Sequence, residues 1–189
     1  VRVARSDSPQ GPFLDFNGVD VNTEQDHGPM ILAPYQFLDH GGWQGTSHPS
    51  VFQDNGQYFM AHQGRPSVNK FFMVMHVRKL FWTADGWAVV SPERFARVAQ
   101  TPVGKNELSG EWEQIELGYR VVPGYAAEQV AADLQVAATI SLNADTLTYN
   151  APWLDLKWGR VYVSRGRDWE NKRDTLVFTG LDGRGNALW

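Results

Sequence analysis

Residues 45–59 read Gly45-Thr46-Ser47-His48-Pro49-Ser50-Val51-Phe52-Gln53-Asp54-Asn55-Gly56-Gln57-Tyr58-Phe59, and this stretch decides the fold. It begins as a loop of small residues that presents a histidine. It continues as a strand and turns at Asp54-Asn55-Gly56 into a second strand. A tight hairpin needs positive φ at its centre, a conformation that Asn and Gly tolerate. The stretch therefore predicts a β-hairpin that the chain enters through His48.

A second hairpin follows directly. Residues 73–82 have a strand pattern, residues 83–86 (Thr-Ala-Asp-Gly) form a turn signal, and residues 87–91 read as the returning strand. Trp82 and Trp87 flank this turn, and we expect them to pack as a cross-strand pair. Two hairpins in succession indicate an antiparallel sheet.

Strand and turn signals recur at short spacing along the rest of the chain, which is typical of an all-β protein. Residues 111–117, 160–164 and 175–180 read as strands, and residues 137–149 read as a strand pair folded at Asn143-Ala144-Asp145. Residues 126–134 fit a helical turn or two, without a decisive pattern.

Both ends of the sequence read as strands. Residues 1–6 alternate apolar and polar side chains from the first position. Residues 186–189 begin a return strand after the turn signal at residues 181–185. We therefore expect the chain to be a piece of a larger protein.

Composition narrows the classes of function. The 189 residues, 42% of them hydrophobic, suffice for one large domain or two small ones. Eight Trp, six Tyr and ten Phe suit both β structure and stacking on sugar rings.

A net charge of −4 without a basic cluster argues against a nucleic-acid partner. The absence of Cys excludes disulfides and Cys-ligated zinc. No run approaches the ~18 apolar residues of a membrane span, which argues against a membrane partner.

Five stretches resemble the arabinan-degrading branch of glycoside hydrolase family 43. Residues 5–13 resemble its strand that ends in Arg-Ser and runs through a Gly-Pro-aromatic turn, and residues 45–51 resemble its Gly-x-x-His-x-Ser-Val element. Residues 76–91 resemble the Asp-Gly-Trp hairpin of the last blade. Residues 110–113 and 176–182 resemble the β module appended to many of these arabinanases. The stretches occur in the family's order and touch most of the chain.

The resemblance implies an all-β fold in two parts. Residues 1–97 correspond to the last blades of a five-bladed β-propeller. Residues 98–106 correspond to a linker, and residues 107–189 to a small β-sandwich or barrel-like accessory domain.

The resemblance also implies an inverting glycosidase. Inversion needs a carboxylic acid and a carboxylate base, roughly 6.5–9.5 Å apart. In the family these groups lie on the first three blades, upstream of the matching stretches. The carboxylates of Asp15, Asp54 and Asp85 fit turns, and those of Glu24 and Asp26 fit a solvated loop. We expect no catalytic residue in this chain, and a partner, the N-terminal portion of the same enzyme, that supplies the carboxylates.

His48 is the predicted metal ligand. The matching family histidine points into the central channel and binds a cation, usually assigned as calcium, whose other ligands are mostly water. Calcium prefers oxygen ligands, so the implied ion is hydrated, and its charge biases the pKa values of the acid and base. The alternative is a histidine that caps a loop or bonds within the core, which is how we interpret His27, His40, His62 and His76.

Three residues are predicted to bind substrate. Trp43 lies in the loop before His48 and is a candidate for stacking on an arabinofuranose ring. Gln63 and Arg65 follow the returning strand, a region from which a family arginine often reaches the active centre. Gln63-Gly64-Arg65 replaces the aromatic and acidic residues common in close relatives, so the resemblance is loose here.

The sequence thus predicts the C-terminal portion of a glycoside hydrolase that cleaves α-1,5-L-arabinofuranosyl linkages in arabinan. The enzyme would be secreted, or held in the periplasm or at the surface of a bacterium, and this chain alone would be inactive. Two other classes stay open: a non-catalytic carbohydrate-binding β protein and a structural β domain. Xylan in place of arabinan is open as well.

Overall fold

A computed structural model describes residues 1–23, 29–69, 71–118 and 134–189. Within these ranges the chain is built of β-strands and two 3₁₀ turns, with no α-helix, so the predicted all-β class is confirmed. The helical turns predicted over residues 126–134 fall almost wholly outside the described residues. Among the described residues, no helix is long and apolar enough to span a membrane.

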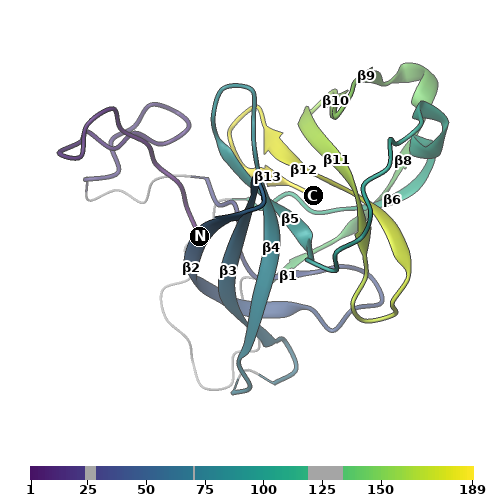
Figure 1. Ribbon diagram of the computed structural model, residues 1–189, viewed down its shortest axis with the longest axis horizontal. Coiled ribbons are helices and arrows are strands. Elements are labelled where there is room, and N and C mark those ends of the chain that lie inside the picture. The colour runs from purple at the N-terminus through teal and green to yellow at the C-terminus, as the bar shows by residue number, and fades with distance from the viewer. Residues whose placement is uncertain (24–28, 70, 119–133) are drawn as a thin grey trace.

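The first sheet is an antiparallel meander extended at one edge. Its strands are β1 (Tyr35–Gln36), β2 (Trp43–Asp54), β3 (Gln57–Pro66), β4 (Val74–Trp82), β5 (Ala88–Arg94) and β7 (Gln135–Val136). Strands β2 to β5 pair in chain order, as in a four-stranded propeller blade. Strand β7 pairs in parallel with β1, far from it in sequence. The meander, traced in Figure 1, is the blade-like part of the predicted fold.

The first predicted hairpin is confirmed at its turn. Strand β2 ends at Asp54 and β3 begins at Gln57. Asn55 and Gly56 between them have φ of +47° and +74°, the left-handed pair that a type I′ turn requires. Asn-Gly adopts this conformation at low cost, which is why so short a signal sets the pairing of β2 with β3.

The second predicted hairpin also forms, but its two tryptophans do not pack on each other. Trp82 lies opposite Ala88 in the β4–β5 register, so Trp87, one position earlier, points to the other face of the sheet. The Trp82 ring instead meets Tyr58, with ring centroids 5.6 Å apart, and Trp87 meets Phe16 at 5.5 Å. The predicted cross-strand pair is wrong, because the turn places the two side chains on opposite faces.

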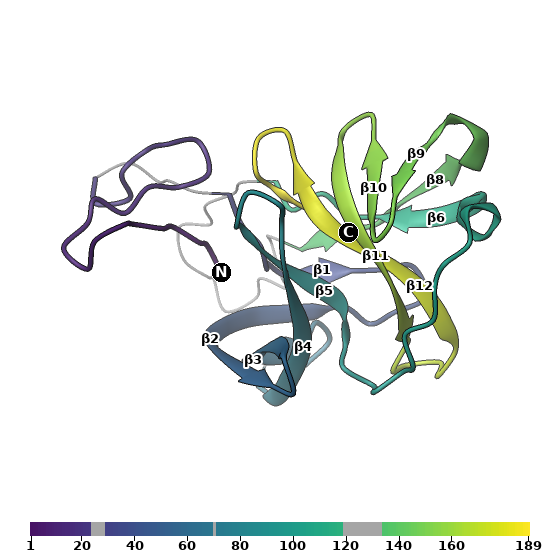
Figure 2. The same ribbon diagram turned by 45° about the horizontal axis from the view of Figure 1, so that its top comes forward.

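The C-terminal half forms a second sheet with a small ribbon beside it. The sheet contains β9 (Thr148–Asn150), β10 (Trp153–Leu156), β11 (Gly159–Arg167), β12 (Asp174–Asp182) and β13 (Ala187–Leu188). The ribbon pairs β6 (Gly110–Gln114) with β8 (Ala138–Leu142), and the 3₁₀ turns η1 (Lys105–Leu108) and η2 (Ala144–Thr146) contact each other beside it. Figure 2 shows β5 of the first sheet running against β12 of the second.

Residues 137–149 do not form the predicted strand pair. The chain does bend at η2, where the Asn143 side chain accepts a hydrogen bond from the Asp145 backbone at 2.9 Å. The strands on either side then join different partners: β8 pairs with β6, and β9 pairs with β10. The bend is a corner between two sheets. The residues Asn143-Ala144-Asp145 predict that the chain turns, but not which strands pair on either side of the turn.

The largest hydrophobic core draws on both halves of the sequence. Trp189, 1% exposed, packs edge-on against Tyr35 with ring centroids 5.0 Å apart and donates from Nε1 to the Val90 carbonyl at 2.8 Å. The Ile115 backbone amide donates to the Trp189 carbonyl at 2.8 Å. The division of the chain at residues 98–106 therefore stays a prediction. The largest hydrophobic core contains residues from both sides of this segment.

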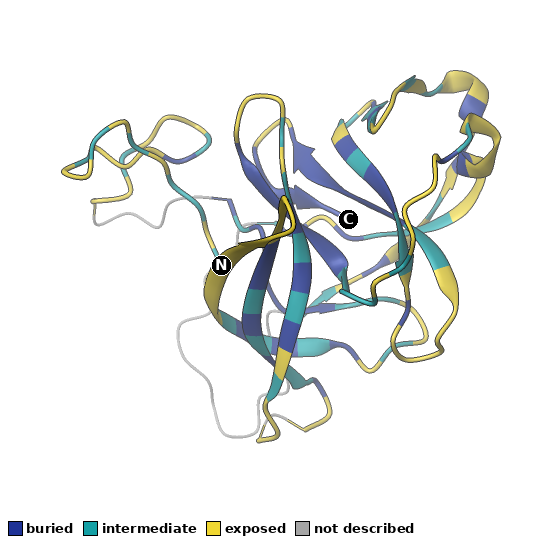
Figure 3. Ribbon diagram, in the orientation of Figure 1, coloured by how far each residue is buried: buried dark blue, intermediate teal, exposed yellow. Residues whose placement is uncertain are grey.

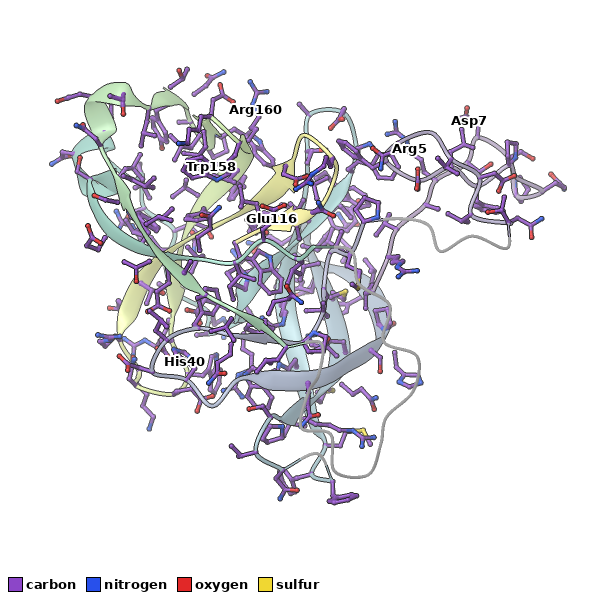
Figure 4. All side chains as sticks on the ribbon, turned by 180° about the vertical axis from the view of Figure 1, so that it is seen from behind. Arg5, Asp7, His40, Glu116, Trp158 and Arg160 are labelled. Carbon is purple, nitrogen blue, oxygen red and sulfur yellow. The ribbon has the colours of Figure 1, made fainter. Side chains whose placement is uncertain are left out.

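Two parts of the molecule are exposed beside the first sheet: the N-terminal segment and the edge strand β2. Residues 1–23 form an arm that projects from the sheets, with Arg5 and Asp7 on it (Figures 1 and 4). Strand β2 is paired with β1 only at Trp43, and its residues from His48 to Asp54 are exposed (Figure 3). Most of β2 is therefore an open sheet edge within the described part of the chain.

Candidate functional site

A bulge in β2 sets the position of His48. The β2–β3 register shifts between Gln44 and Ser47 and again between Ser47 and Ser50. Gly45 and His48 have φ of +58° and +53°, and positive φ in a strand marks a bulge that re-aims side chains. His48 is exposed as a result, although it lies within a paired strand.

Three side chains form a short hydrogen-bonded chain at this bulge. His48 Nδ1 lies 3.0 Å from Ser47 Oγ, and Gln63 Nε2 of β3 donates to the same Oγ at 2.8 Å. Ser47 is paired with Gln63 in the register, so the backbone itself holds these groups together. The structure thus brings together two of the predicted site residues, His48 and Gln63, through a serine that sequence reasoning did not single out.

The tautomer consistent with metal binding is available to His48. A metal-ligating imidazole donates its second ring N–H to a fixed acceptor. If Nδ1–H donates to Ser47 Oγ, the lone pair of Nε2 is left for an ion at the exposed surface. Among the described residues, no group of three or more His, Asp or Glu side chains is arranged to hold a metal ion. The donor set therefore fits only a cation whose remaining ligands are mostly water.

Arg65 lies on the same face of β3 as Gln63, two residues along. A Cβ built on Gly45 would lie 3.2 Å from Arg65 Cδ, so the arginine stem packs directly against the bulge. Glycine at position 45 meets two needs at once: the positive φ and the close approach of this stem. The bulge thus gathers His48, Gln63 and Arg65 on neighbouring positions of two strands.

Trp43 lies elsewhere. Its half-buried ring packs edge-on against His76, with centroids 4.3 Å apart, and the Arg94 guanidinium lies 4.9 Å from its centroid. The ring also packs against the main hydrophobic core. Trp43 is thus at the inner end of β2, before the bulge, and its predicted role as a sugar platform stays a prediction.

A buried polar cluster sits behind the site. Arg78 is fully buried and bonds to His62, His76 and Tyr35, which are buried too. Burial, reinforced by the nearby Arg78 charge, lowers the pKa of His62 to about 4 and that of His76 to about 2. Both rings are neutral at physiological pH. The sequence predicts structural roles for both histidines. Their partner Arg78 follows His76 two residues along the same strand, and this alternation is the signal from which the contact could have been predicted.

Among the predicted turn carboxylates, Asp15 caps backbone amides as expected, whereas Asp54 and Asp85 accept hydrogen bonds from side chains within their turns. Asp15 Oδ1 accepts from the Asn17 and Val19 backbone amides at 2.8 and 2.9 Å. Asp85 accepts from the Thr83 hydroxyl within its own turn. Glu24 and Asp26 lie outside the described residues.

Comparison with known families and proteins gives this architecture a context. Residues 92–189, just over half of the chain, match the model of the C-terminal lipocalin-like domain of glycoside hydrolase family 43. This match begins in β5, before the predicted linker.

Two curated relatives match over the whole chain. They are the extracellular endo-α-(1→5)-L-arabinanase 2 of Bacillus subtilis strain 168 and the extracellular endo-α-(1→5)-L-arabinanase of Thermotoga petrophila, each 23% identical. In both cases the alignment covers 100% of this chain and 45% of the relative. The chain therefore spans about half the length of the curated relatives it matches.

Solved structures agree on the fold. The family 43 glycoside hydrolase YxiA of Bacillus licheniformis superposes with a TM-score of 0.79 at 23% identity. The endo-1,5-α-L-arabinanase of T. petrophila superposes with a TM-score of 0.82 at 20% identity. Each alignment covers 100% of this chain and 47% of the other. Because the family model matches more than half of the chain, this chain belongs to the C-terminal lipocalin-like domains of glycoside hydrolase family 43.

Proposed function

We propose that this chain is the C-terminal portion of a secreted glycoside hydrolase that cleaves α-1,5-L-arabinofuranosyl linkages in arabinan. One observation carries the proposal: two extracellular arabinanases align with every part of this chain and extend to about twice its length. The inverting acid and base then lie on the N-terminal portion of the same enzyme, and this chain contributes the bulge of β2 and the lipocalin-like domain.

The surface of the first sheet supports a missing neighbour. Within the described residues, the edge of β2 beyond Trp43 has no strand partner, and such an edge offers backbone groups to another strand. The turn between β3 and β4 carries a cluster of exposed apolar side chains, which we call the apolar tip: Val68, Phe71, Phe72, Met73 and Met75, between 54% and 87% exposed. An apolar surface of this kind beside an open edge is expected where further propeller blades pack.

In the complete enzyme, His48 would hold a hydrated calcium ion through Nε2, with Ser47 fixing the ring. The ion supplies positive charge that biases the pKa values of the acid and base. Gln63 and Arg65 would donate hydrogen bonds to the sugar from the same face of β3. Trp43 enters the proposal as a third substrate contact, but its packing on His76 gives it the weakest support.

The test uses the protein isolated from its natural host. Native and denaturing mass spectra are compared, and hydrolysis of linear arabinan and of xylan is assayed on the same preparation. We expect this sequence either within one longer polypeptide or noncovalently bound to an N-terminal piece, with activity on arabinan. A lone species near 21.3 kDa without activity on either polymer would overturn the proposal, and activity on xylan alone would correct the substrate.

A further inference from the structure

A cavity of about 540 Å³ lies between the two halves of the sequence, outside the β2 bulge. Its walls include parts of β5, β6 and β12 and the loop after β1, and Trp189 lies among the residues that line it. Figure 4 labels His40 on that loop, beside the turn that joins β11 to β12. Cavities of roughly 300–1,000 Å³ are the usual size for small-molecule sites.

Aromatic rings form part of the apolar lining. Phe178 and Trp189 are 3% and 1% exposed, so the core holds them rigidly. Trp112 lies against Phe178, with ring centroids 5.4 Å apart, and its Nε1 donates to the Leu108 carbonyl at 3.0 Å. A fixed, partly exposed indole beside rigid apolar walls is a surface on which the C–H face of a sugar ring can stack.

Several carboxylates in the lining already have partners. Glu113 Oε2 accepts from the Leu38 backbone amide at 2.8 Å, and Asp168 pairs with His40 at 2.8 Å. These contacts fix the loop after β1 and the turn after β11 as walls of the cavity. They build the site, and Asp168, which also accepts from the Glu170 and Asn171 backbone amides, keeps little capacity for a ligand.

Glu93 and Glu111 are different. The Glu93 carboxylate has one long contact among the described residues, from Thr175 Oγ1 at 3.5 Å. Burial, together with the nearby Asp168 charge, raises the pKa of Glu93 above its ordinary value. Glu111 is an exposed residue on β6 and makes no ion pair with the described part of the chain. Two carboxylates, one on β5 and one on β6, thus line the cavity and are ready to accept hydrogen bonds from a ligand.

The charges in the lining select the kind of ligand. Acidic side chains outnumber basic ones, which disfavours phosphates and fatty acids. Arg173 lines the cavity as well and offers donors. A neutral ligand rich in hydroxyl groups matches both: its hydroxyls donate to Glu93 and Glu111, and its oxygens accept from Arg173.

We propose that this cavity binds an uncharged short oligosaccharide, stacked on Trp112 and hydrogen-bonded to Glu93 and Glu111. The choice of arabinose units as the sugar rests on the proposed function, whereas the assignment of a saccharide rests on the cavity alone.

The test is calorimetric titration of the 189-residue chain with arabinotriose, xylotriose and maltotriose. The double variant Glu93→Gln/Glu111→Gln keeps the side-chain shapes and removes both charges. Glu116→Gln is the matched control, because Glu116 pairs with Arg184 and does not line the cavity. We expect saturable binding of arabinotriose that weakens at least about tenfold in the double variant and is unchanged in the control. Circular dichroism verifies that all three chains are folded.

A second measurement uses the complete protein. Its depletion from solution by insoluble arabinan should fall in the double variant, while its hydrolysis of soluble arabinotriose stays the same. Absence of sugar binding by the folded chain would overturn the inference, as would equal binding by wild type and double variant. Binding of xylotriose or maltotriose alone would keep the saccharide site but reject arabinose as its ligand.

These outcomes separate the two proposals. Sugar binding at the cavity without arabinan hydrolysis by the complete protein would reject the proposed enzyme and favour a carbohydrate-binding protein. Hydrolysis without binding at the cavity would reject only the saccharide site in the cavity.

Discussion

Arg78 Nε donates to His62 Nε2 at 2.8 Å, and both side chains are buried. The guanidinium also donates to His76 Nδ1, to the Tyr35 hydroxyl and to the Ser91 and Pro92 carbonyls. Every one of these acceptors is neutral. A buried cation is thus held by hydrogen bonds to neutral groups, with the Glu93 carboxylate near enough to interact with its charge. These hydrogen bonds fix which nitrogen of each imidazole carries the proton.

Replacing Arg78 should therefore destabilise the protein strongly. Arg78→Lys keeps the positive charge, but the lysine ammonium cannot donate to all five acceptors of the guanidinium. Some buried acceptors therefore lose their hydrogen-bond donor. We expect the free energy of unfolding to fall by about 2–4 kcal/mol in urea denaturation. Arg160→Lys is the control, since Arg160 pairs with Asp155 at an exposed position. Equal stability of both variants would show that the network contributes little.

Stability should also fall as the solution is acidified below pH 6.5. The folded pKa values of His62 and His76, about 4 and about 2, lie below the ordinary value of 6.5. The unfolded chain then binds more protons than the folded one as pH falls through 6.5. The stabilisation is complete above that pH and is lost progressively towards the folded pKa values. Each histidine contributes a slope of up to about 1.4 kcal/mol per pH unit.

The measurement is urea denaturation between pH 5 and 7 for wild type, His62→Gln and His48→Gln. The raised pKa of Glu93 contributes the opposite slope, but this contribution cancels in the comparison of variants. His62→Gln should flatten the profile by about half, and exposed His48→Gln should leave it unchanged. Parallel profiles for all three proteins would contradict neutral burial of His62.

Local signals in the sequence predicted local structure well. Asn55-Gly56 specifies its own turn, because positive φ is a property of those two residues, and the pairing of β2 with β3 follows from it. His48 and Gln63 come together for the same reason: they flank that hairpin at nearly matching distances from the turn. Hairpin geometry is therefore the part of the candidate site that sequence reasoning can reach.

Contacts between distant segments were not predictable in this way. Strand β7 joins β1 in parallel, and the cavity needs Trp112 and Phe178, which lie on separate elements. The sequence of a strand does not determine which strand it pairs with, because strand pairing depends on packing against side chains far along the chain. The bend at η2 shows the same limit. The bend itself follows from local residues, but the strands on either side of it pair with different strands, which local residues do not determine.

Gly180 should be irreplaceable in β12. A Cβ at this position would lie 2.2 Å from the Arg160 carbonyl oxygen and 2.7 Å from Val161 Cα, both backbone atoms of the neighbouring strand. Gly180→Ala must therefore push β11 away, and we expect a loss of about 2–4 kcal/mol in unfolding free energy. Gly183→Ala, where a Cβ meets nothing within 4 Å, should have little effect in the same thermal and urea experiments. Similar losses for both would contradict the close approach of β11 and β12.

The apolar tip should control association with the N-terminal portion. Phe72 and Met75 are 62% and 75% exposed, so charged replacements there leave the fold of this chain intact. Phe72→Glu/Met75→Glu should weaken binding of this chain to a separately produced N-terminal portion at least about tenfold and reduce self-association of the isolated chain. Analytical ultracentrifugation measures both. The same double charge at Val136 and Trp169, exposed on other elements, is the control, and an equal effect there would reject a specific role for the tip.

His48→Gln tests the proposed ion directly. His48 is exposed and its ring contact is to Ser47, so the variant should fold with unchanged stability. In the complete enzyme it should lose bound calcium, measured by elemental analysis after gel filtration, and lose activity on arabinan at least about tenfold. Gln53→Ala, also exposed on β2 but outside the Ser47 hydrogen bonds, should keep both. Ser47→Ala should weaken calcium binding to an intermediate degree, because the imidazole loses the partner that fixes its tautomer. If His48→Gln retains full calcium content and full activity, the histidine is a structural residue of the bulge, and the ion, where present, is held by the N-terminal portion.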